Sequence, residues 1–171
     1  MLRILGIDPG SRITGYGLIE SDGQRSVHIE HGALRLQGEE LPPRLGEIFR
    51  RVSGLIEQHR PEVMAIEQVF VSKNASSALK LGQARGAAIC AAIQYGLSVA
   101  EYTPTRIKQS VVGTGRADKS QIQQMVKMIL SLSEIPQADA ADALAVALSH
   151  AHTQATLSRH QTAGGWGGSG R

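Results

Sequence analysis

Residues 4–10 read ILGIDPG, an apolar run that ends in an aspartate followed by a Pro-Gly turn. The run predicts a buried strand over residues 2–8, with Asp8 at its C-terminal end. A second run, VMAI at 63–66, ends in the same way at Glu67 and predicts another buried strand. We expect these two strands to be neighbours at the centre of one sheet, so that both carboxylates lie side by side at its edge.

Apolar periodicity predicts the remaining elements. Strands are expected over 13–20 and 26–36, joined by a Ser-Asp-Gly turn, so that the first three strands form an antiparallel meander. The spacing then becomes helical, and the further elements are a helix from 41 to the Arg60-Pro61 pair, a helix near 75–95, a strand near 97–102, and helices near 104–111, 118–130 and 138–152. This order predicts an α/β fold, with a mixed five-stranded sheet and helices on both faces.

Size and composition indicate one soluble domain. The chain has 171 residues, 42% hydrophobic and 19% charged, which is enough to bury a core. We expect the domain to span residues 1–153, and the Thr/Gln/Ser/Gly-rich residues 154–171 to form a disordered tail. The only cysteine, Cys90, excludes an intrachain disulfide, and we expect it to be a small buried residue. No stretch approaches the roughly 20 apolar residues of a membrane span and no export signal is visible, so we expect a cytoplasmic protein.

Positive charge is concentrated in the middle third of the chain. The net charge is only +3, but residues 71–133 hold eight Lys or Arg residues against Glu101 and Asp118. A basic region beside an acidic cluster suits a polyanion held over a metal site. A solvated surface rich in lysine explains the same excess equally well.

Two further acids stand at the start of the last predicted helix. Asp139 and Asp142 are three residues apart and therefore share one helical face. If this helix packs across the sheet edge that carries Asp8 and Glu67, four carboxylates converge, and such a cluster repels itself without cations. Carboxylate oxygens suit Mg²⁺ and Mn²⁺, and two ions about 3.5–4 Å apart would form a clamp for phosphoryl transfer. Each acid alone has a simpler explanation as a turn, a strand end or a complement to the helix dipole.

Three parts of the chain resemble RuvC-type Holliday-junction resolvases. They are residues 6–17 (GIDPG and TGYG), residues 65–86 (AIEQVF, KN and LGQARG) and residues 139–145 (DAADALA). The resemblance covers about residues 1–152 and implies a ribonuclease-H-like fold and a homodimer. It also implies Mg²⁺-dependent resolution of four-way DNA junctions in recombination and repair, by paired symmetric nicks that leave 5′-phosphate and 3′-hydroxyl ends.

The resemblance also implies the site and its partners. The family's catalytic, metal-binding carboxylates correspond to Asp8, Glu67, Asp139 and Asp142. They imply two Mg²⁺ ions, with Mn²⁺ as a substitute, and we expect Asp8 to bridge them. The implied protein partners are the junction-binding RuvA and the branch-migration motor RuvB.

An aromatic residue and several basic residues are candidates for DNA contacts. On composition alone Phe70 belongs to the core, but the resemblance favours a role in stacking on bases or wedging between them. Lys108 and Lys119 flank the Gly113 loop; either can be a surface lysine, and the resemblance supports a phosphate contact for both and a catalytic role for Lys119. Further candidates for phosphate contacts are Lys73, Arg85 and Arg116.

Small residues recur every fourth position on the helix near 75–95, at Ala78, Gly82 and Gly86. Such a stripe lets another element approach closely, either the protein's own sheet or a second subunit. The resemblance favours the second subunit, because a two-fold dimer would carry two sites for two strands. We interpret His150 and His152 as structural or surface residues.

Three rival functions are weighed against this one. An ATP-binding domain of the actin and sugar-kinase type begins with a similar Gly-Ile-Asp-x-Gly turn, but it needs two domains and a second Gly-rich loop. A non-catalytic junction-binding module would not need all four acids. The third is a nuclease of the same fold that cuts RNA–DNA hybrids. The basic middle region and the Phe70 segment argue weakly against it.

Overall fold

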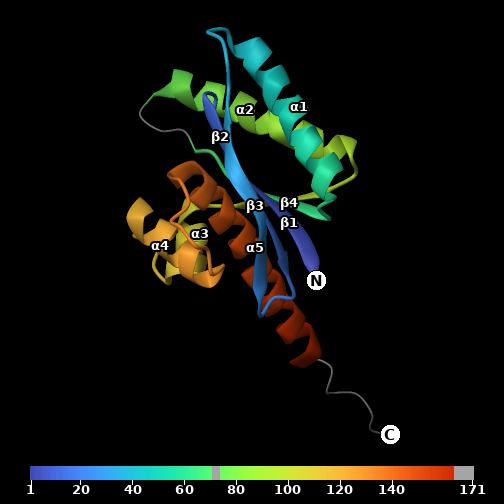
Figure 1. Ribbon diagram of the computed structural model, residues 1–171, viewed down its shortest axis with the longest axis vertical. Coiled ribbons are helices and arrows are strands. Elements are labelled where there is room, and N and C mark those ends of the chain that lie inside the picture. Colours follow the sequence, from blue (N-terminus) through green and yellow to red (C-terminus); the bar gives the residue numbers. More distant parts are fainter. Residues whose placement is uncertain (71–73, 164–171) are drawn as a thin grey trace, which may run out of the picture.

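In the computed structural model, which describes residues 1–70 and 74–163, five strands form one mixed sheet in the order β3-β2-β1-β4-β5 (Figure 1). Strands β1 (Leu2–Asp8), β2 (Ile13–Ser21) and β3 (Ser26–Arg35) form an antiparallel meander. Strand β4 (Val63–Glu67) pairs in parallel with β1, and β5 (Ser98–Tyr102) pairs in parallel with β4. The predicted sheet and its meander are confirmed, and the two strands that end in acids are neighbours at its centre.

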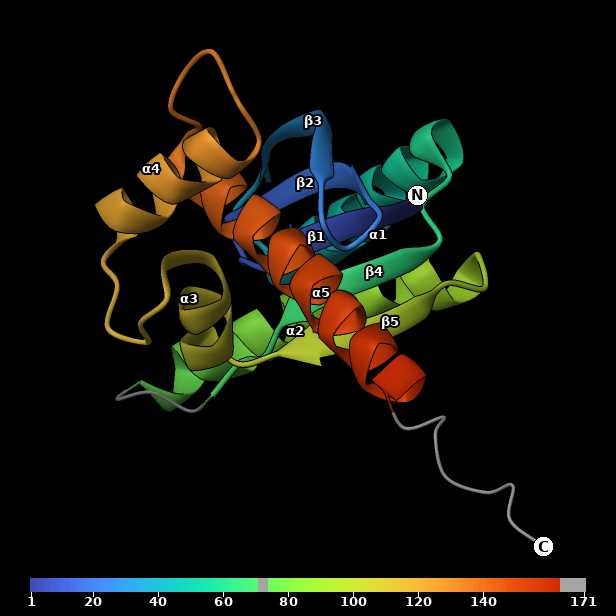
Figure 2. The same cartoon turned by 90° about the horizontal axis from the view of Figure 1, so that it is seen from below.

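Helices cover both faces of this sheet, as predicted (Figure 2). Helices α1 (Leu41–His59) and α2 (Ala75–Gln94) pack on one face. Helices α3 (Pro104–Val112), α4 (Lys119–Ile129) and α5 (Ala138–Ala163) pack on the other. None of the helices in the described part of the chain is long and apolar enough to cross a membrane.

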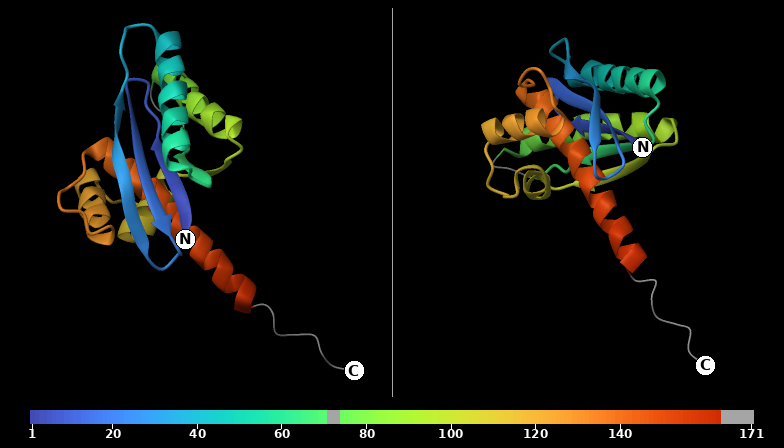
Figure 3. Two further views of the ribbon diagram at one scale, coloured as in Figure 1. Left: turned by 45° about the vertical axis from the view of Figure 1, so that its right-hand side comes forward. Right: turned by 60° about the horizontal axis from the view of Figure 1, so that its bottom comes forward.

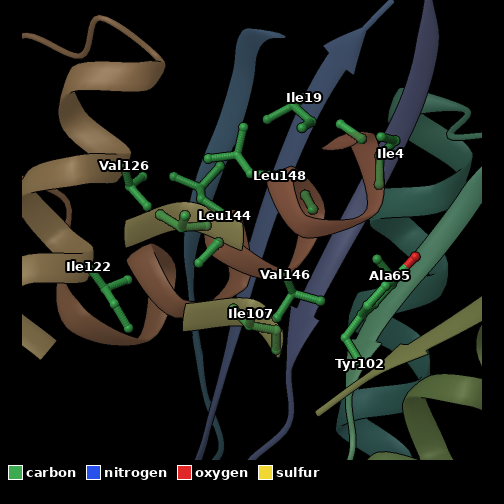
Figure 4. Close-up of a cluster of buried hydrophobic side chains, with 14 of the residues drawn as sticks. Ile4, Ile19, Ala65, Tyr102, Ile107, Ile122, Val126, Leu144, Val146 and Leu148 are labelled. Atoms are coloured by element: carbon green, nitrogen blue, oxygen red, sulfur yellow. The ribbon is translucent and has the colours of Figure 1, made fainter. Parts of the chain in front are cut away.

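Each face has its own hydrophobic core, because successive side chains of a strand point to opposite faces. On β1, Leu5 and Ile7 belong to the cluster under α1 and α2, while Ile4 belongs to the cluster under α5. Figure 4 shows this second cluster, in which Leu144 and Leu148 of α5 lie between the sheet and helix α4. The first turns of α5 are therefore fixed against the centre of the sheet.

Glycines on the strands allow α5 to lie unusually close to the sheet. A Cβ added to Gly6 would lie 2.1 Å from the carbonyl oxygen of Ala143, and one added to Gly15 would lie 2.0 Å from that of Asp139. Contacts this short mean that no side chain fits at either position unless the backbone shifts. The glycines of the first two strands thus set the position of the helix that carries Asp139 and Asp142.

The last helix is longer than the sequence pattern predicted. Helix α5 continues to Ala163 rather than ending near residue 152, and its last turns extend past the sheet (Figure 3). No glycine or proline interrupts the chain between Pro136 and Gly164, so nothing in it stops helix propagation. The expectation of disorder is therefore wrong for residues 154–163; the rest of the predicted tail lies outside the described residues.

The prediction for the only cysteine is also wrong. Cys90 is exposed on α2, whereas Ala84, Ala88 and Ala91 are buried against the sheet. Alanines occur on all sides of this helix, so its sequence gives little contrast between a buried and an exposed face. The 3.6-residue period, started from Ala84, leads to Ala88 and Ala91 and leaves Cys90 on the outer side.

Candidate functional site

The sheet register brings Asp8 and Glu67 to one edge. Ile7 of β1 stands opposite Ile66 of β4 in the parallel pair, and the next residue on each strand is the acid. On its other side Asp8 pairs with Gly15 of β2, over which the carbonyl group of Asp139 lies directly. The first turn of α5 therefore covers the end of β1. Asp8, Glu67 and Asp142 line one cavity at this edge, and Asp139 is near enough to raise the pKa of Asp8. The convergence of the four carboxylates on one metal site stays a prediction.

Burial and mutual repulsion dominate the electrostatics of this edge. Burial, followed by the neighbouring Glu67, Asp142 and Asp139, raises the pKa of Asp8 to about 8. Burial also raises the pKa of Glu67 and of Asp142 above their ordinary values. The ammonium group of Lys119 offsets this negative charge only modestly, because its Nζ lies 3.8 Å from Oδ2 of Asp142. The surroundings of Asp8, Glu67 and Asp142 thus disfavour their ionised forms, which a bound cation would favour.

The chemistry of these four side chains fits a hard divalent cation, because all of them are carboxylates. Asp139 is also oriented by its neighbour, since Nε2 of Gln137 donates to its Oδ2 at 2.9 Å. Across the residues that the structure describes, no three acidic, histidine or cysteine side chains are already gathered closely enough to hold an ion. The carboxylates share an electrostatic field, and ion binding would have to draw their oxygens together.

These raised pKa values predict how stability depends on pH without metal. In the native state Asp8 should stay protonated up to about pH 8, whereas in the unfolded chain it should lose its proton near its ordinary pKa of 3.8. Between these limits the native state binds more protons, so the free energy of unfolding should fall as pH rises from about 4 to about 8. Thermal melting in EDTA from pH 4 to 9 measures this. Parallel curves for the wild type and Asp8→Asn would contradict it, because the variant lacks the titrating group.

Two cavities flank the acidic edge. One, of about 530 Å³, is lined by Asp8, Glu67 and Asp142 and by the basic Lys108 and Lys119 of α3 and α4. A capping box fixes the start of α4, where Lys119 lies: Asp118 accepts from the Gln121 backbone N–H, and the Gln121 side chain accepts from the Asp118 N–H. This cavity has acidic and basic walls, which suits a phosphate group held over a cation.

The second cavity, of about 320 Å³, is more apolar and also includes Asp8 and Glu67. Its other walls include Phe70, Ala78 and Leu81. Phe70 is 60% exposed, so the core interpretation of this residue is wrong. An exposed aromatic ring next to carboxylates is available for stacking on a base.

The other predicted DNA contacts have different surroundings. Arg116 is exposed in the loop that precedes α4. Arg85 is half-buried: its Nε donates to the carbonyl oxygen of Glu67 at 3.1 Å, and its guanidinium forms an ion pair with Glu101 at 2.9 Å. Lys73 lies outside the described residues.

Two residues that the sequence analysis missed hold the loop after Asp8. The buried Oγ1 of Thr14 donates to the carbonyl oxygen of Gly10 at 2.9 Å and accepts from the Gly10 N–H at 3.3 Å. Arg44 is only 4% exposed and donates to the carbonyl oxygen of Ser11 at 2.8 Å. An arginine near the start of an amphipathic helix gives no sign of burial in the sequence, and only the three-dimensional contact identifies it.

His150 and His152 of α5 are structural, as interpreted. His150 is buried, and its Nδ1 lies 2.7 Å from the hydroxyl group of Tyr102, to which it is hydrogen-bonded. His152 is hydrogen-bonded to Ser110 of α3 at 3.1 Å. Both side chains fasten α5 to the elements beside it.

Comparison with known proteins gives a consistent match. The family described as crossover junction endodeoxyribonuclease RuvC matches residues 4–150. The RuvC proteins of Pseudoalteromonas atlantica and Citrifermentans bemidjiense are 62% and 60% identical, over 92% and 88% of this chain and 91% and 92% of theirs. The structure of Thermus thermophilus RuvC in complex with a Holliday junction substrate is 33% identical, with a TM-score of 0.86 over 92% of this chain and 97% of that one. Sequence and fold agree along nearly the whole length, and the chain therefore belongs to the RuvC family of crossover junction endodeoxyribonucleases.

Proposed function

We propose that this protein resolves Holliday junctions in the cytoplasm, by paired symmetric nicks that leave 5′-phosphate and 3′-hydroxyl ends. The observation that carries the proposal is the edge of the sheet where Asp8 and Glu67 end neighbouring strands beneath Asp139 and Asp142 of α5. Membership in the family and the junction bound by the Thermus relative support four-way DNA as the substrate.

The proposed cofactor is Mg²⁺, two ions for each site, with Mn²⁺ as a substitute. Asp8, Glu67, Asp139 and Asp142 would hold these ions, with Asp8 as the most central of the four, because the other three all raise its pKa. When bound, such ions would activate the attacking water and stabilise the charge of the phosphate and the leaving oxygen. The raised pKa values support this, because a cation would relieve the repulsion that protons relieve in its absence.

The lysines on the opposite wall of the cavity complete the proposed site. Lys108 and Lys119 both act on the carboxylates, since each lowers the pKa of Glu67 and of Asp142. The side chain of Lys119 is 73% exposed and only weakly paired with Asp142. It can therefore turn toward a phosphate and stabilise the negative charge that develops during cleavage.

A single assay tests this function against its rivals. The protein is incubated with a synthetic immobile four-way junction, with and without Mg²⁺, and symmetric nicks in opposite strands are scored. A linear duplex and an RNA–DNA hybrid serve as alternative substrates, and ATP turnover is measured without DNA. Binding without metal-dependent nicking would favour a junction-binding module, and preferred cutting of the hybrid would favour a different nuclease.

Replacing the exposed Phe70 with alanine should lower nicking by about tenfold, since stacking of one base on an aromatic ring is worth about 1–3 kcal/mol. The melting temperature should stay near that of the wild type, because the ring is 60% exposed. Junction nicking and thermal melting are measured on the same preparation. Phe49→Ala, at a partly buried ring packed against the α1 core, is the control that should lose stability. A comparable loss of stability in Phe70→Ala would restore the core interpretation.

We also propose that the protein is a homodimer whose subunits meet along α2. A Cβ added to Gly82 or Gly86 would meet nothing within 4 Å, so packing onto the protein's own sheet does not explain these glycines. A glycine inside a helix costs up to about 1 kcal/mol relative to alanine. The exposed apolar Leu79 and Ile93 lie along the same helix. A second copy of α2 could approach closely at Gly82 and Gly86, and it would cover Leu79 and Ile93.

Replacing Gly86 with leucine should convert this dimer into a folded monomer, because the added side chain would fill the space reserved for the other subunit. Sedimentation equilibrium measures the mass, and circular dichroism checks the fold. Gly54→Leu, at an exposed glycine of α1 that also has open space, is the matched control and should remain dimeric. A dimer of normal affinity in Gly86→Leu would exclude this face as the interface.

The proposed protein partners are RuvA, bound to the junction, and the branch-migration motor RuvB. Support for both comes from membership in the RuvC family. Co-sedimentation of the protein with RuvA–junction complexes, compared with the junction alone, would test the first of these contacts.

A further inference from the structure

We propose that Arg85 and Glu101 form a clamp that positions Glu67, and that Arg85 is a positioning residue rather than the phosphate contact expected from the sequence. The inference rests on the proposed function, in which Glu67 is a ligand for the cation. It concerns the part of β4 where the chain leaves the sheet.

The clamp joins three elements at the end of β4. Arg85 extends from α2, and its Nε donates to the carbonyl oxygen of Glu67 at 3.1 Å. The same guanidinium forms an ion pair with Glu101 of β5, with Nη2 2.9 Å from Oε2. Glu101 in turn stands opposite Ile66 in the parallel pair of β4 and β5. Arg85 therefore connects the backbone of Glu67 to a neighbouring strand and to a helix on one face of the sheet.

The residue after Glu67 takes part in the same network. The backbone N–H of Gln68 donates to the carbonyl oxygen of Tyr102 at 2.8 Å, and its side-chain Nε2 donates to Glu101 at 3.4 Å. Both contacts hold the chain on the β5 side just as the strand ends. Outer contacts of this kind orient a ligand before an ion arrives and are a general feature of metal sites.

The surroundings of Arg85 argue against a direct role in binding phosphate. Its side chain is only 18% exposed, compared with 73% for Lys119. Its charge already faces a carboxylate, and one of its donors is used by a backbone carbonyl. A phosphate would have to displace Glu101 from a position in which it also accepts from Gln68.

The decisive variants are Arg85→Gln and Glu101→Gln, each of which breaks the ion pair from one side. If Arg85 and Glu101 position Glu67, either variant should weaken Mn²⁺ binding in the absence of DNA by roughly 10–100-fold. Each should also slow junction nicking by roughly 10–100-fold. Mn²⁺ alone is the probe, and its free concentration is followed by electron paramagnetic resonance. The double variant should be little worse than either single one, because the two residues act as a unit.

Junction binding without divalent ions separates the clamp from a phosphate contact. If Arg85 only positions Glu67, the salt dependence of junction binding is the same in the wild type, Arg85→Gln and Glu101→Gln. If Arg85 instead contacts phosphate, Arg85→Gln lowers the salt slope by about one ion, and Glu101→Gln frees the guanidinium and binds at least as tightly as the wild type. Arg85→Lys keeps the charge but cannot make both contacts, so the clamp predicts a loss in Mn²⁺ affinity and a phosphate contact predicts none.

Arg51→Gln and Glu47→Gln are the matched controls, because they break an ion pair of 3.2 Å on α1 that is outside the acidic edge. Both should bind Mn²⁺ and nick normally. Normal Mn²⁺ affinity in Arg85→Gln, or a loss confined to junction binding, would overturn the clamp; if Arg85→Gln does not fold, Glu101→Gln and Arg85→Lys decide in the same way. A wild type that neither binds Mn²⁺ nor nicks would overturn the proposed function instead.

Discussion

Asp8→Asn is expected to lose junction nicking by about 10³-fold while it still binds the junction. Asp8 is the most central of the four acids, since it ends the middle strand and interacts with the other three carboxylates. Charge stabilisation by bound metal ions is worth several kcal/mol in the transition state, and about 4 kcal/mol corresponds to about 10³-fold in rate. Junction binding depends on phosphate contacts elsewhere and does not need this carboxylate. Nicking of a labelled junction under single-turnover conditions and a gel-shift titration measure the two properties separately.

The same variant should gain stability in EDTA, which distinguishes a removed ligand from a damaged fold. At pH 8 and above, ionised Asp8 is buried among three other acids, and asparagine removes that cost. Added Mg²⁺ should then raise the melting temperature of the wild type more than that of Asp8→Asn. Asp22→Asn, in the exposed turn between β2 and β3, is the matched control and should nick normally. Normal nicking by Asp8→Asn would show that the reaction does not need the Asp8 carboxylate.

The acidic edge could be predicted because its residues interrupt clear patterns. Asp8 and Glu67 each end an apolar run, and such a run marks both the strand and the position of its end. The order of the strands then fixes which ends are neighbours. The spacing of Asp139 and Asp142 is equally visible, since it places both on one helical face.

What the sequence could not predict depends on contacts between distant segments. Nothing in the sequence next to Arg85 or Lys119 shows that one is held by Glu101 and that the other is exposed. Cys90 lies on a helix with alanines on every side, so its exposure has no local signal. The sequence pattern likewise places the four acids at one sheet edge but does not set the distances between their carboxylate oxygens, which in the described residues are not gathered closely enough to hold an ion.

Gly15 shows how the backbone, rather than any acidic side chain, sets the geometry of the site. It is the partner of Asp8 in the β1–β2 ladder, and it also lies directly beneath the carbonyl group of Asp139. One position thus defines the distance between the strand that carries the first acid and the helix that carries two others. Its Thr-Gly-Tyr-Gly context was visible in the sequence as part of the resemblance, but the reason for the glycine is the approach of α5.

Gly15→Ala is therefore expected to lower nicking by about 10²-fold, although no charged group is changed. The new Cβ would lie 2.0 Å from the Asp139 carbonyl oxygen, so α5 must move away from the sheet. Overpacking of this kind costs about 1–3 kcal/mol of stability, and a displacement of about 1 Å at a catalytic group can cost about 10²-fold in rate. Thermal melting and single-turnover nicking measure both effects.

The matched control is Gly54→Ala, at an exposed glycine of α1 where an added Cβ would meet nothing within 4 Å. This change should stabilise the protein by about 0.5–1 kcal/mol, because alanine favours the helix, and should leave nicking unchanged. The same chemical substitution is thus expected to have opposite effects on stability at two glycines. If Gly15→Ala nicks and melts like the wild type, the close contact between β2 and α5 does not position the acids, and the strands alone must do so.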